Sequence, residues 1–194
     1  MQRLDEEKRQ AIIVAAQKRL ARHGVKKTTM QEIAKDAGIA VGTLYLYFKN
    51  KNEILIATAN TYTQQHLLDA DKILRANMPA DQKLKAYLLN RFRAVQEIHL
   101  SGSHAAELAR TVMALQPELK AAEDLSVTNN VQSILQEGIR EKLFEIKKLD
   151  RDLQVFLCSI GIFFPIPTTE QYYEPDKAKL CLVIDWFIEK WSAA

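Results

Sequence analysis

Residues 28–48 read TTMQEIAKDAGIAVGTLYLYF, and they indicate the fold that we expect. The tetrapeptide TMQE at 29–32 fits a capping box, in which a hydroxyl and a carboxylate each satisfy a free backbone N–H at the start of a helix. Gly38 ends this helix, because glycine adopts positive φ without strain. A second, short helix then runs from about Val41 to Phe48. The pattern predicts a helix-turn-helix.

The second helix has the side chains that a DNA-reading helix needs. Leu44 and Phe48, four residues apart, are expected to anchor it to the helices before it. A helix that enters the major groove needs small leading residues, and Gly42 and Thr43 meet this need. Thr43 can contact a base edge or a thymine methyl.

Contacts to the phosphate backbone are predicted around this helix. Tyrosine hydroxyls, a lysine in the first turn of the next helix and a threonine before the capping box are groups that bind phosphate. The full set of predicted DNA-binding residues is Thr28, Thr29, Gly42, Thr43, Tyr45, Tyr47, Lys49 and Lys51.

The charge distribution agrees with a DNA-binding N-terminal part. Residues 1–51 contain 11 lysines and arginines against 5 aspartates and glutamates, a net charge of +6, whereas residues 52–194 carry a net charge of −3. Lys26, Lys27 and Lys49 supply the attraction to DNA that does not depend on sequence. A solvated charged face would give the same asymmetry. The charge distribution therefore supports the prediction of DNA binding only together with the helix-turn-helix pattern.

The rest of the chain is predicted to be helical, which makes the fold all-α with about nine helices. Apolar residues make up 47% of the chain, while glycine (6) and proline (5) are scarce. No apolar run approaches the ~20 residues of a membrane span, and the charged N-terminus does not resemble a signal peptide, so we expect a cytoplasmic protein with no membrane contact. The expected helices cover about residues 5–23, 29–37, 41–48, 50–75, 83–100, 104–115, 117–147, 153–164 and 176–191.

The residues from about Ile12 to Leu55 resemble the TetR family of bacterial transcriptional regulators. The turn glycine Gly38, the run GTLY at 42–45, the pair Tyr47-Phe48 and Lys51 all fall at the family's spacing. Two positions depart from the usual pattern. Ala40 stands where many members have serine, which puts one helix cap and phosphate contact in doubt. Tyr47 stands where many members have histidine.

The resemblance implies a homodimer that binds a palindromic operator on double-stranded DNA and is released by a small-molecule effector. It implies a DNA-binding domain at residues 1–51 and a helical effector-binding and dimerisation domain at residues 52–194. The two C-terminal apolar helices could form monomer core or half of an intersubunit bundle, and the resemblance favours the interface. The predicted interface residues are Phe156, Ile160, Phe163, Phe164, Leu180, Val183, Ile184, Phe187, Ile188 and Trp191.

An effector cavity is predicted from apolar residues with a few polar groups among them, although each of these residues could also be ordinary core. The candidates are Tyr62, His66, Phe92, Gln96, His99, Leu108, Val112 and Phe144. His99, His104 and Glu107 match no specific metal-ligand spacing, so no metal and no cofactor is expected.

The leading functional hypothesis is therefore a ligand-responsive, sequence-specific transcriptional regulator, most simply a repressor. No nucleophile–base pair, phosphate-binding loop or pair of catalytic carboxylates is present in the sequence pattern, so an enzyme is not expected. One alternative is a helical small-molecule enzyme or carrier whose N-terminal bundle is only structural. Another is a DNA-coating protein that prefers no sequence, which would show a steep salt dependence.

Overall fold

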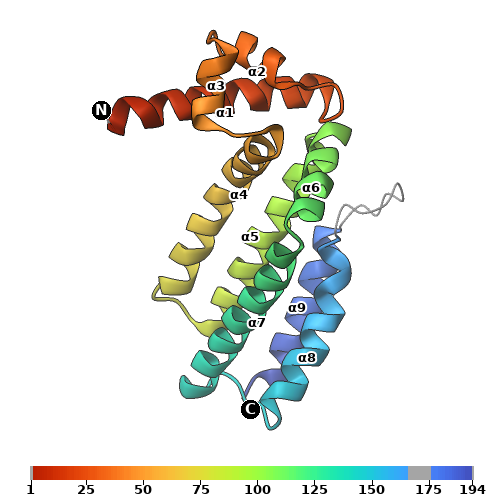
Figure 1. Cartoon of the computed structure of the whole chain (residues 1–194). Helices are drawn as coiled ribbons and strands as arrows, with labels where there is room; N and C mark the ends of the chain where they lie inside the picture. The colour runs from red at the N-terminus through yellow and green to blue at the C-terminus, as the bar shows by residue number, and fades with distance from the viewer. Residues whose placement is uncertain (1, 166–175, 194) are drawn as a thin grey trace. The chain divides into compact units, whose positions relative to one another are not determined.

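The computed structural model describes residues 2–165 and 176–193 and, within these ranges, all side chains except those of residues 2–4 and 99. These ranges contain nine α-helices, one 3-10 helix and no β-strand (Figure 1). In chain order the elements are α1 (Gln2–His23), α2 (Met30–Asp36), α3 (Val41–Tyr47), α4 (Lys51–Arg75), α5 (Ala80–Leu100), α6 (Ser103–Leu115), α7 (Pro117–Arg140), α8 (Leu149–Ile160), the 3-10 helix η1 (Gly161–Phe163) and α9 (Lys177–Trp191).

The chain divides into two compact units. Unit 1 comprises Met1–Gln65 and Glu97–Pro117, and unit 2 comprises His66–Gln96 and Glu118–Ala194. Helices α4 and α5 each contribute residues to both units. The two units are defined by contacts between residues and not by function. The predicted boundary at residue 51, between a DNA-binding domain and an effector-binding and dimerisation domain, stays a prediction.

The core of unit 1 holds the helix-turn-helix in place. Ile12, Ala16 and Leu20, the apolar stripe of α1, are all buried. Leu44 is 0% exposed and Phe48 is 2% exposed, so the two anchors predicted for α3 are confirmed. Helix α6 also packs against α1 within this unit. The position of α3 is thus fixed by apolar burial rather than by its own seven residues, which are too few for a stable isolated helix.

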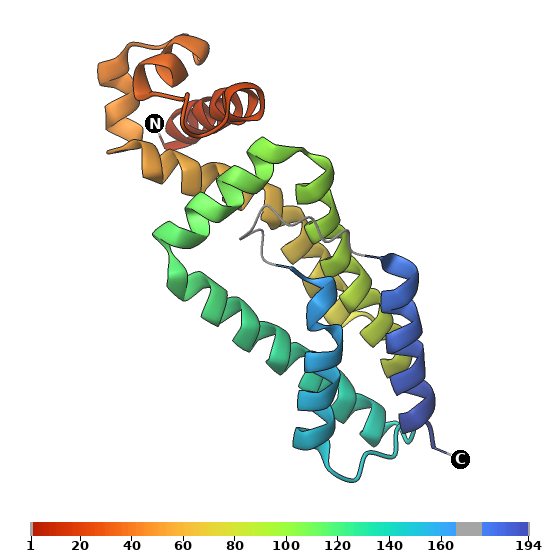
Figure 2. The same ribbon diagram turned by 90° about the vertical axis from the view of Figure 1, so that its right-hand side faces the viewer.

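The core of unit 2 is built around an aromatic cluster between α8 and α9. These helices run in opposite directions and contact each other (Figures 1 and 2). The ring of Phe156 lies 5.0 Å from that of Phe187 and 5.3 Å from that of Trp191, both in edge-to-face geometry. Phe144 adds a further edge-to-face contact to Trp191 at 6.1 Å. Aromatic pairs in this geometry add to the stabilisation from area burial alone.

Helix α7 ends at Arg140, seven residues before the predicted end at Lys147. The N–H groups of Leu143 and Phe144 both donate to the carbonyl of Gly138, and Lys142 adopts a φ of 59°. The ring of Phe144 lies so close to Gly138 that a Cβ there would stand 2.2 Å from it. After Arg140 the chain thus folds Phe144 back over Gly138, which the helical period of the sequence does not reveal.

Helices α5 and α8 also start earlier than the sequence predicts. Helix α5 begins at Ala80 rather than Lys83, because the N–H of Lys83 already donates to the carbonyl of Pro79. Helix α8 begins at Leu149 rather than Leu153, and the carbonyl of the preceding residue, Lys148, accepts a hydrogen bond from the N–H of Asp152. Both helices start one turn earlier than their apolar stripes.

Candidate DNA interface

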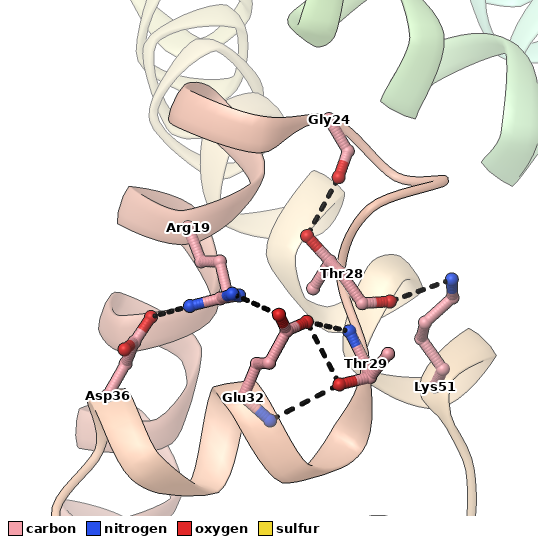
Figure 3. Close-up of polar contacts among 7 residues, drawn as sticks. All are labelled: Arg19, Gly24, Thr28, Thr29, Glu32, Asp36 and Lys51. Carbon is pink, nitrogen blue, oxygen red and sulfur yellow. Dashed lines mark hydrogen bonds and ion pairs between the residues drawn. The ribbon is translucent and has the colours of Figure 1, made fainter.

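The capping box predicted at the start of α2 is present. The hydroxyl of Thr29 accepts a hydrogen bond from the N–H of Glu32, and the Glu32 carboxylate accepts the N–H and the hydroxyl of Thr29, each at 2.9 Å (Figure 3). The hydrogen bonds from the Thr29 hydroxyl and N–H, together with the charge of Arg19, hold the pKa of Glu32 below its usual value. Thr29 is exposed, but its hydroxyl is already used inside the protein.

Arg19 ties α1 to both ends of α2. Its guanidinium lies 2.6 Å from the carboxylate of Glu32 and 2.9 Å from that of Asp36 (Figure 3). The hydrogen bond to Asp36, followed by the charges of both carboxylates, raises the pKa of Arg19, although partial burial opposes this. The arginine therefore contributes orientation of α2 rather than a free positive charge for DNA.

The side chains of Thr28 and Lys51 make hydrogen bonds within the protein that the sequence did not predict. Thr28 is 0% exposed, and its hydroxyl donates to the carbonyl of Gly24 at 2.7 Å. The ammonium of Lys51 donates to the carbonyls of Val25 at 2.9 Å and Thr28 at 3.0 Å (Figure 3). The side chains of both residues hold the turn between α1 and α2. A phosphate contact from either residue stays a prediction.

The turn between α2 and α3 brings the start of α3 to the surface. Gly38 has a φ of +68°, as predicted, and the N–H of Ile39 donates to the carbonyl of Ala34. Ala40 is the N-cap of α3 and makes no side-chain cap. Gly42 is exposed, and a Cβ added to it would meet no atom within 4 Å. The leading end of α3 is therefore slim and open to a ligand.

The outward side of α3 carries one residue that the sequence pattern did not single out. Thr43 is half-buried and Tyr45 is 48% exposed. Leu46 is 84% exposed. The helical period indicates that Leu46 faces outward, because it follows Gly42 by four residues and so lies on the same side of the helix. The sequence analysis did not select Leu46, because an apolar side chain is expected to face inward.

Tyr47 is half-buried, and its hydroxyl donates to the carboxylate of Asp5 at 2.9 Å. This hydrogen bond, with partial burial and the Asp5 charge, raises the pKa of Tyr47. The two residues line an open groove of about 440 Å³ together with Glu6, Arg9 and Leu46. Tyr47 thus joins the start of α1 to α3, and a phosphate contact would have to compete with Asp5.

Three lysines give this part of unit 1 an exposed positive charge. Lys26 and Lys27 are exposed in the turn before α2, and Lys49 is exposed directly after α3. The ammonium of Lys51 donates to backbone carbonyls (Figure 3). Among the described residues, the ammonium groups of these three lysines make no such hydrogen bond. They are placed to supply the attraction to phosphate that does not depend on base sequence.

A carboxylate on α6 holds the turn that precedes α2. Gly24 has a φ of +73°, and the N–H of the next residue, Val25, donates to the carboxylate of Glu107 at 2.9 Å. His104 lies 3.7 Å from the same carboxylate. A Cβ at Gly24 would stand 2.5 Å from the Glu107 carboxylate and 2.6 Å from the His104 ring. Glycine at this position therefore permits both the positive φ and the close approach of α6.

The eight residues predicted to line an effector cavity fall into different environments. Leu108 and Val112 belong to the core of unit 1, whereas Phe92 and Phe144 belong to the core of unit 2. Packing within each unit accounts for the burial of these four. Tyr62 is 44% exposed, His66 and Gln96 are half-buried, and the His99 side chain lies outside the described residues.

Most of the predicted interface residues are buried within their own chain. Phe156, Ile160, Phe163, Leu180, Ile184, Phe187 and Trp191 all lie in the core of unit 2, and Phe164, Val183 and Ile188 are half-buried against it. These seven buried side chains are not available at the surface to a second copy. The outward side of the same segment instead presents Val155 (47% exposed), Ile162 (58%), Leu182 (69%) and Trp186 (55%).

Two further features bear on function. Within residues 2–165 and 176–193, no helix combines the length and apolar character needed to cross a membrane. Over the same described ranges, no three histidine, cysteine, aspartate or glutamate side chains gather in an arrangement that could hold a metal ion.

Comparison with known proteins gives consistent matches. The family model for bacterial regulatory proteins of the tetR family matches residues 12–58. The chain is 30% identical over 177 residues to the fatty acid metabolism regulator protein of Bacillus subtilis, across 89% of this chain and 86% of the relative.

Solved structures share the fold. A transcriptional regulator from Cytophaga hutchinsonii is 24% identical, with a TM-score of 0.72 over 94% of this chain and 97% of that one. RolR, solved in complex with resorcinol, is 17% identical, with a TM-score of 0.52 over 98% of this chain and 90% of its own. The expected all-helical fold with an N-terminal helix-turn-helix is confirmed by these likenesses and the family match.

Proposed function

The chain belongs to the TetR family of bacterial regulatory proteins, and on this basis we propose that it is a ligand-responsive repressor that a small molecule releases from a palindromic operator. Members of this family are transcriptional regulators rather than enzymes, so an enzymatic role is set aside. We propose that residues 1–51 bind DNA and that residues 52–194 bind the effector and dimerise. The protein then acts in the cytoplasm, where its operator is.

The observation that carries the proposal is the outward side of α3. A short helix is anchored by Leu44 and Phe48 and presents Gly42, Thr43 and Tyr45 to solvent. A recognition helix enters the major groove in this way, with small residues leading. Exposed lysines on both sides of the motif supply the phosphate contacts that fix its register.

A homodimer follows from reading a palindrome, because two copies of α3 must meet successive major grooves roughly 34–36 Å apart. We propose that the second copy packs on the exposed apolar side chains of α8, η1 and α9, namely Val155, Ile162, Leu182 and Trp186. Four outward apolar side chains on these three elements favour an isologous contact over a free surface.

The effector response is proposed from the relatives. RolR was solved with resorcinol, and the relative from Bacillus subtilis is named for fatty acid metabolism. We therefore propose that the operator lies beside genes of fatty acid metabolism and that a fatty acid is among the effectors. A coupling of about 1–3 kcal/mol between the effector and operator sites is typical of such regulation.

The operator is found by selecting bound duplexes from a random library with the full chain. Tyr45→Ala is expected to weaken binding of the selected duplex by about tenfold or more, the worth of one hydrogen bond to a charged phosphate. Thr43→Ala is expected to change which base is preferred at one position of each half-site. Leu119→Ala truncates a side chain of similar exposure, 45% against 48%, on α7 and serves as the matched control.

The effector is tested by titrating fatty acids of increasing length into the operator complex. Release of DNA at a defined length supports the proposal. A library that enriches no sequence, with binding that only falls steeply with salt, would support a non-specific DNA-coating protein instead.

A further inference from the structure

Leu46 is the most exposed large apolar side chain among those that the structure describes, at 84%. Its neighbours Leu44 and Phe48 are buried and anchor α3, so packing within the chain makes no use of Leu46. A single exposed leucine is ordinary on a protein surface. This leucine, however, stands on the short helix whose outward side is the candidate DNA interface.

The position of Leu46 on α3 is fixed by its neighbours. It follows Gly42 by one helical turn, and the space around Gly42 is open, since an added Cβ would contact nothing within 4 Å. Tyr45 stands beside it and is also exposed. A ligand that contacts the exposed backbone at Gly42 would therefore also contact the Leu46 side chain. Leu46 is thus part of the same candidate interface.

The chemistry of the major groove limits what a leucine can contact there. Leucine neither donates nor accepts hydrogen bonds, so it cannot read the polar edges of the bases. A phosphate oxygen is an equally poor partner, because burying that charge against an apolar group costs free energy. The thymine 5-methyl is the apolar group that the base edges present in this groove.

We propose that Leu46 packs against the 5-methyl group of a thymine in each half-site and thereby selects a T·A pair. The inference rests on the proposed function, because it requires α3 to enter the major groove. Leu46 then determines specificity through a contact that excludes water from both groups. Removal of one buried methyl group corresponds to about a fourfold decrease in affinity.

The test uses the full chain and the operator enriched from a random duplex library. Each thymine in one half-site is replaced in turn by deoxyuridine, which removes the methyl group and leaves every hydrogen-bonding group in place. The same replacement is then made in both half-sites, and dissociation constants are measured by fluorescence anisotropy at constant salt. We expect one thymine per half-site at which the replacement weakens binding about fourfold, and about fifteenfold when both half-sites carry it.

The Leu46→Ala variant identifies the contact. It is expected to bind the thymine and deoxyuridine operators with equal affinity at that position and to keep the wild-type response at the others. Leu100→Ala, which truncates a leucine of similar exposure (79%) at the end of α5, is expected to retain the full methyl effect. Because Leu46 is exposed, its truncation leaves the core intact, which circular dichroism verifies.

The proposed function and the role of Leu46 fail on different outcomes. If an operator is enriched but no thymine methyl matters, or if Leu46→Ala keeps the methyl effect, the inference about Leu46 is overturned while the proposed function stands. If no duplex is enriched at all, the proposed function fails and this inference fails with it.

Discussion

At the scale of single residues, Lys51 and Lys49 are two lysines close in sequence in different environments. The ammonium of Lys51 donates to the carbonyls of Val25 and Thr28, whereas Lys49 is exposed. Hydrogen bonds from a charged donor to partly buried carbonyls contribute more to stability than neutral ones. Sequence spacing alone made both residues candidates for phosphate binding.

Lys51→Met is expected to lower the free energy of unfolding by about 1–3 kcal/mol, because it keeps the aliphatic stem and leaves two carbonyls without their donor. Denaturant titration measures this change. The slope of log affinity for the operator against log salt is expected to stay as in the wild type. A reduced slope in this variant would return Lys51 to the phosphate contacts.

Lys49→Met is the matched control. It is expected to leave stability within about 0.5 kcal/mol, as for most surface substitutions. It is also expected to reduce the salt slope by about 1 for each phosphate that the lysine neutralises in the wild type. The two variants thus separate a lysine that builds the motif from one that meets DNA.

At the scale of elements, α2 is seven residues long and depends on its cap and on Arg19. The capping box satisfies N–H groups that a helix start leaves free. Glu32 participates in both arrangements, since it accepts from Thr29 and pairs with Arg19. Its ionisation therefore links the position of α2 to pH.

The lowered pKa of Glu32 predicts how stability changes in acid. The Glu32 carboxyl binds its proton less tightly in the folded protein than in the unfolded protein. Its contribution to the free energy of unfolding is therefore present above the unfolded pKa and is lost as pH falls through the folded pKa. Glu32→Gln keeps the capping geometry without titrating. The stability difference between wild type and Glu32→Gln is expected to be largest near neutral pH and to shrink below the ordinary glutamate pKa. Urea titrations at a series of pH values measure it, and a difference that does not vary with pH would contradict the assignment.

At the scale of the whole molecule, the proposed dimer depends on which side of α8 and α9 faces outward. The aromatic cluster of Phe156, Phe187 and Trp191 lies inward, so a partner can reach only the opposite side of these helices. Leu182 is the most exposed apolar residue on that side, at 69%. A charge placed there would be buried in the proposed contact without an opposite charge to pair with.

Leu182→Lys is expected to convert the proposed dimer to a monomer, because the contact would bury an unpaired charge on each copy. Analytical ultracentrifugation measures the change. Binding to the palindrome is expected to weaken strongly, while binding to a single half-site changes little. Leu67→Lys, at 68% exposure on α4, is the matched control and is expected to remain dimeric. Dimerisation that survives Leu182→Lys would place the interface elsewhere.

Local sequence was sufficient to predict the all-helical fold and the design of the helix-turn-helix. The capping box, the positive φ of Gly38 and the anchors Leu44 and Phe48 were all predicted, because each depends on residues within a few positions of one another. Helical period and turn chemistry are local properties, and a sequence displays them directly.

What each side chain meets depends instead on long-range packing. The packing places Lys51 on the α1–α2 turn, buries Thr28, and leaves Leu46 and Leu182 facing outward. The helical period says which residues share a stripe, but it does not say whether that stripe is covered by the same chain or left for a partner. That choice depends on contacts between residues far apart in sequence, such as Phe156 with Trp191, which no local pattern encodes.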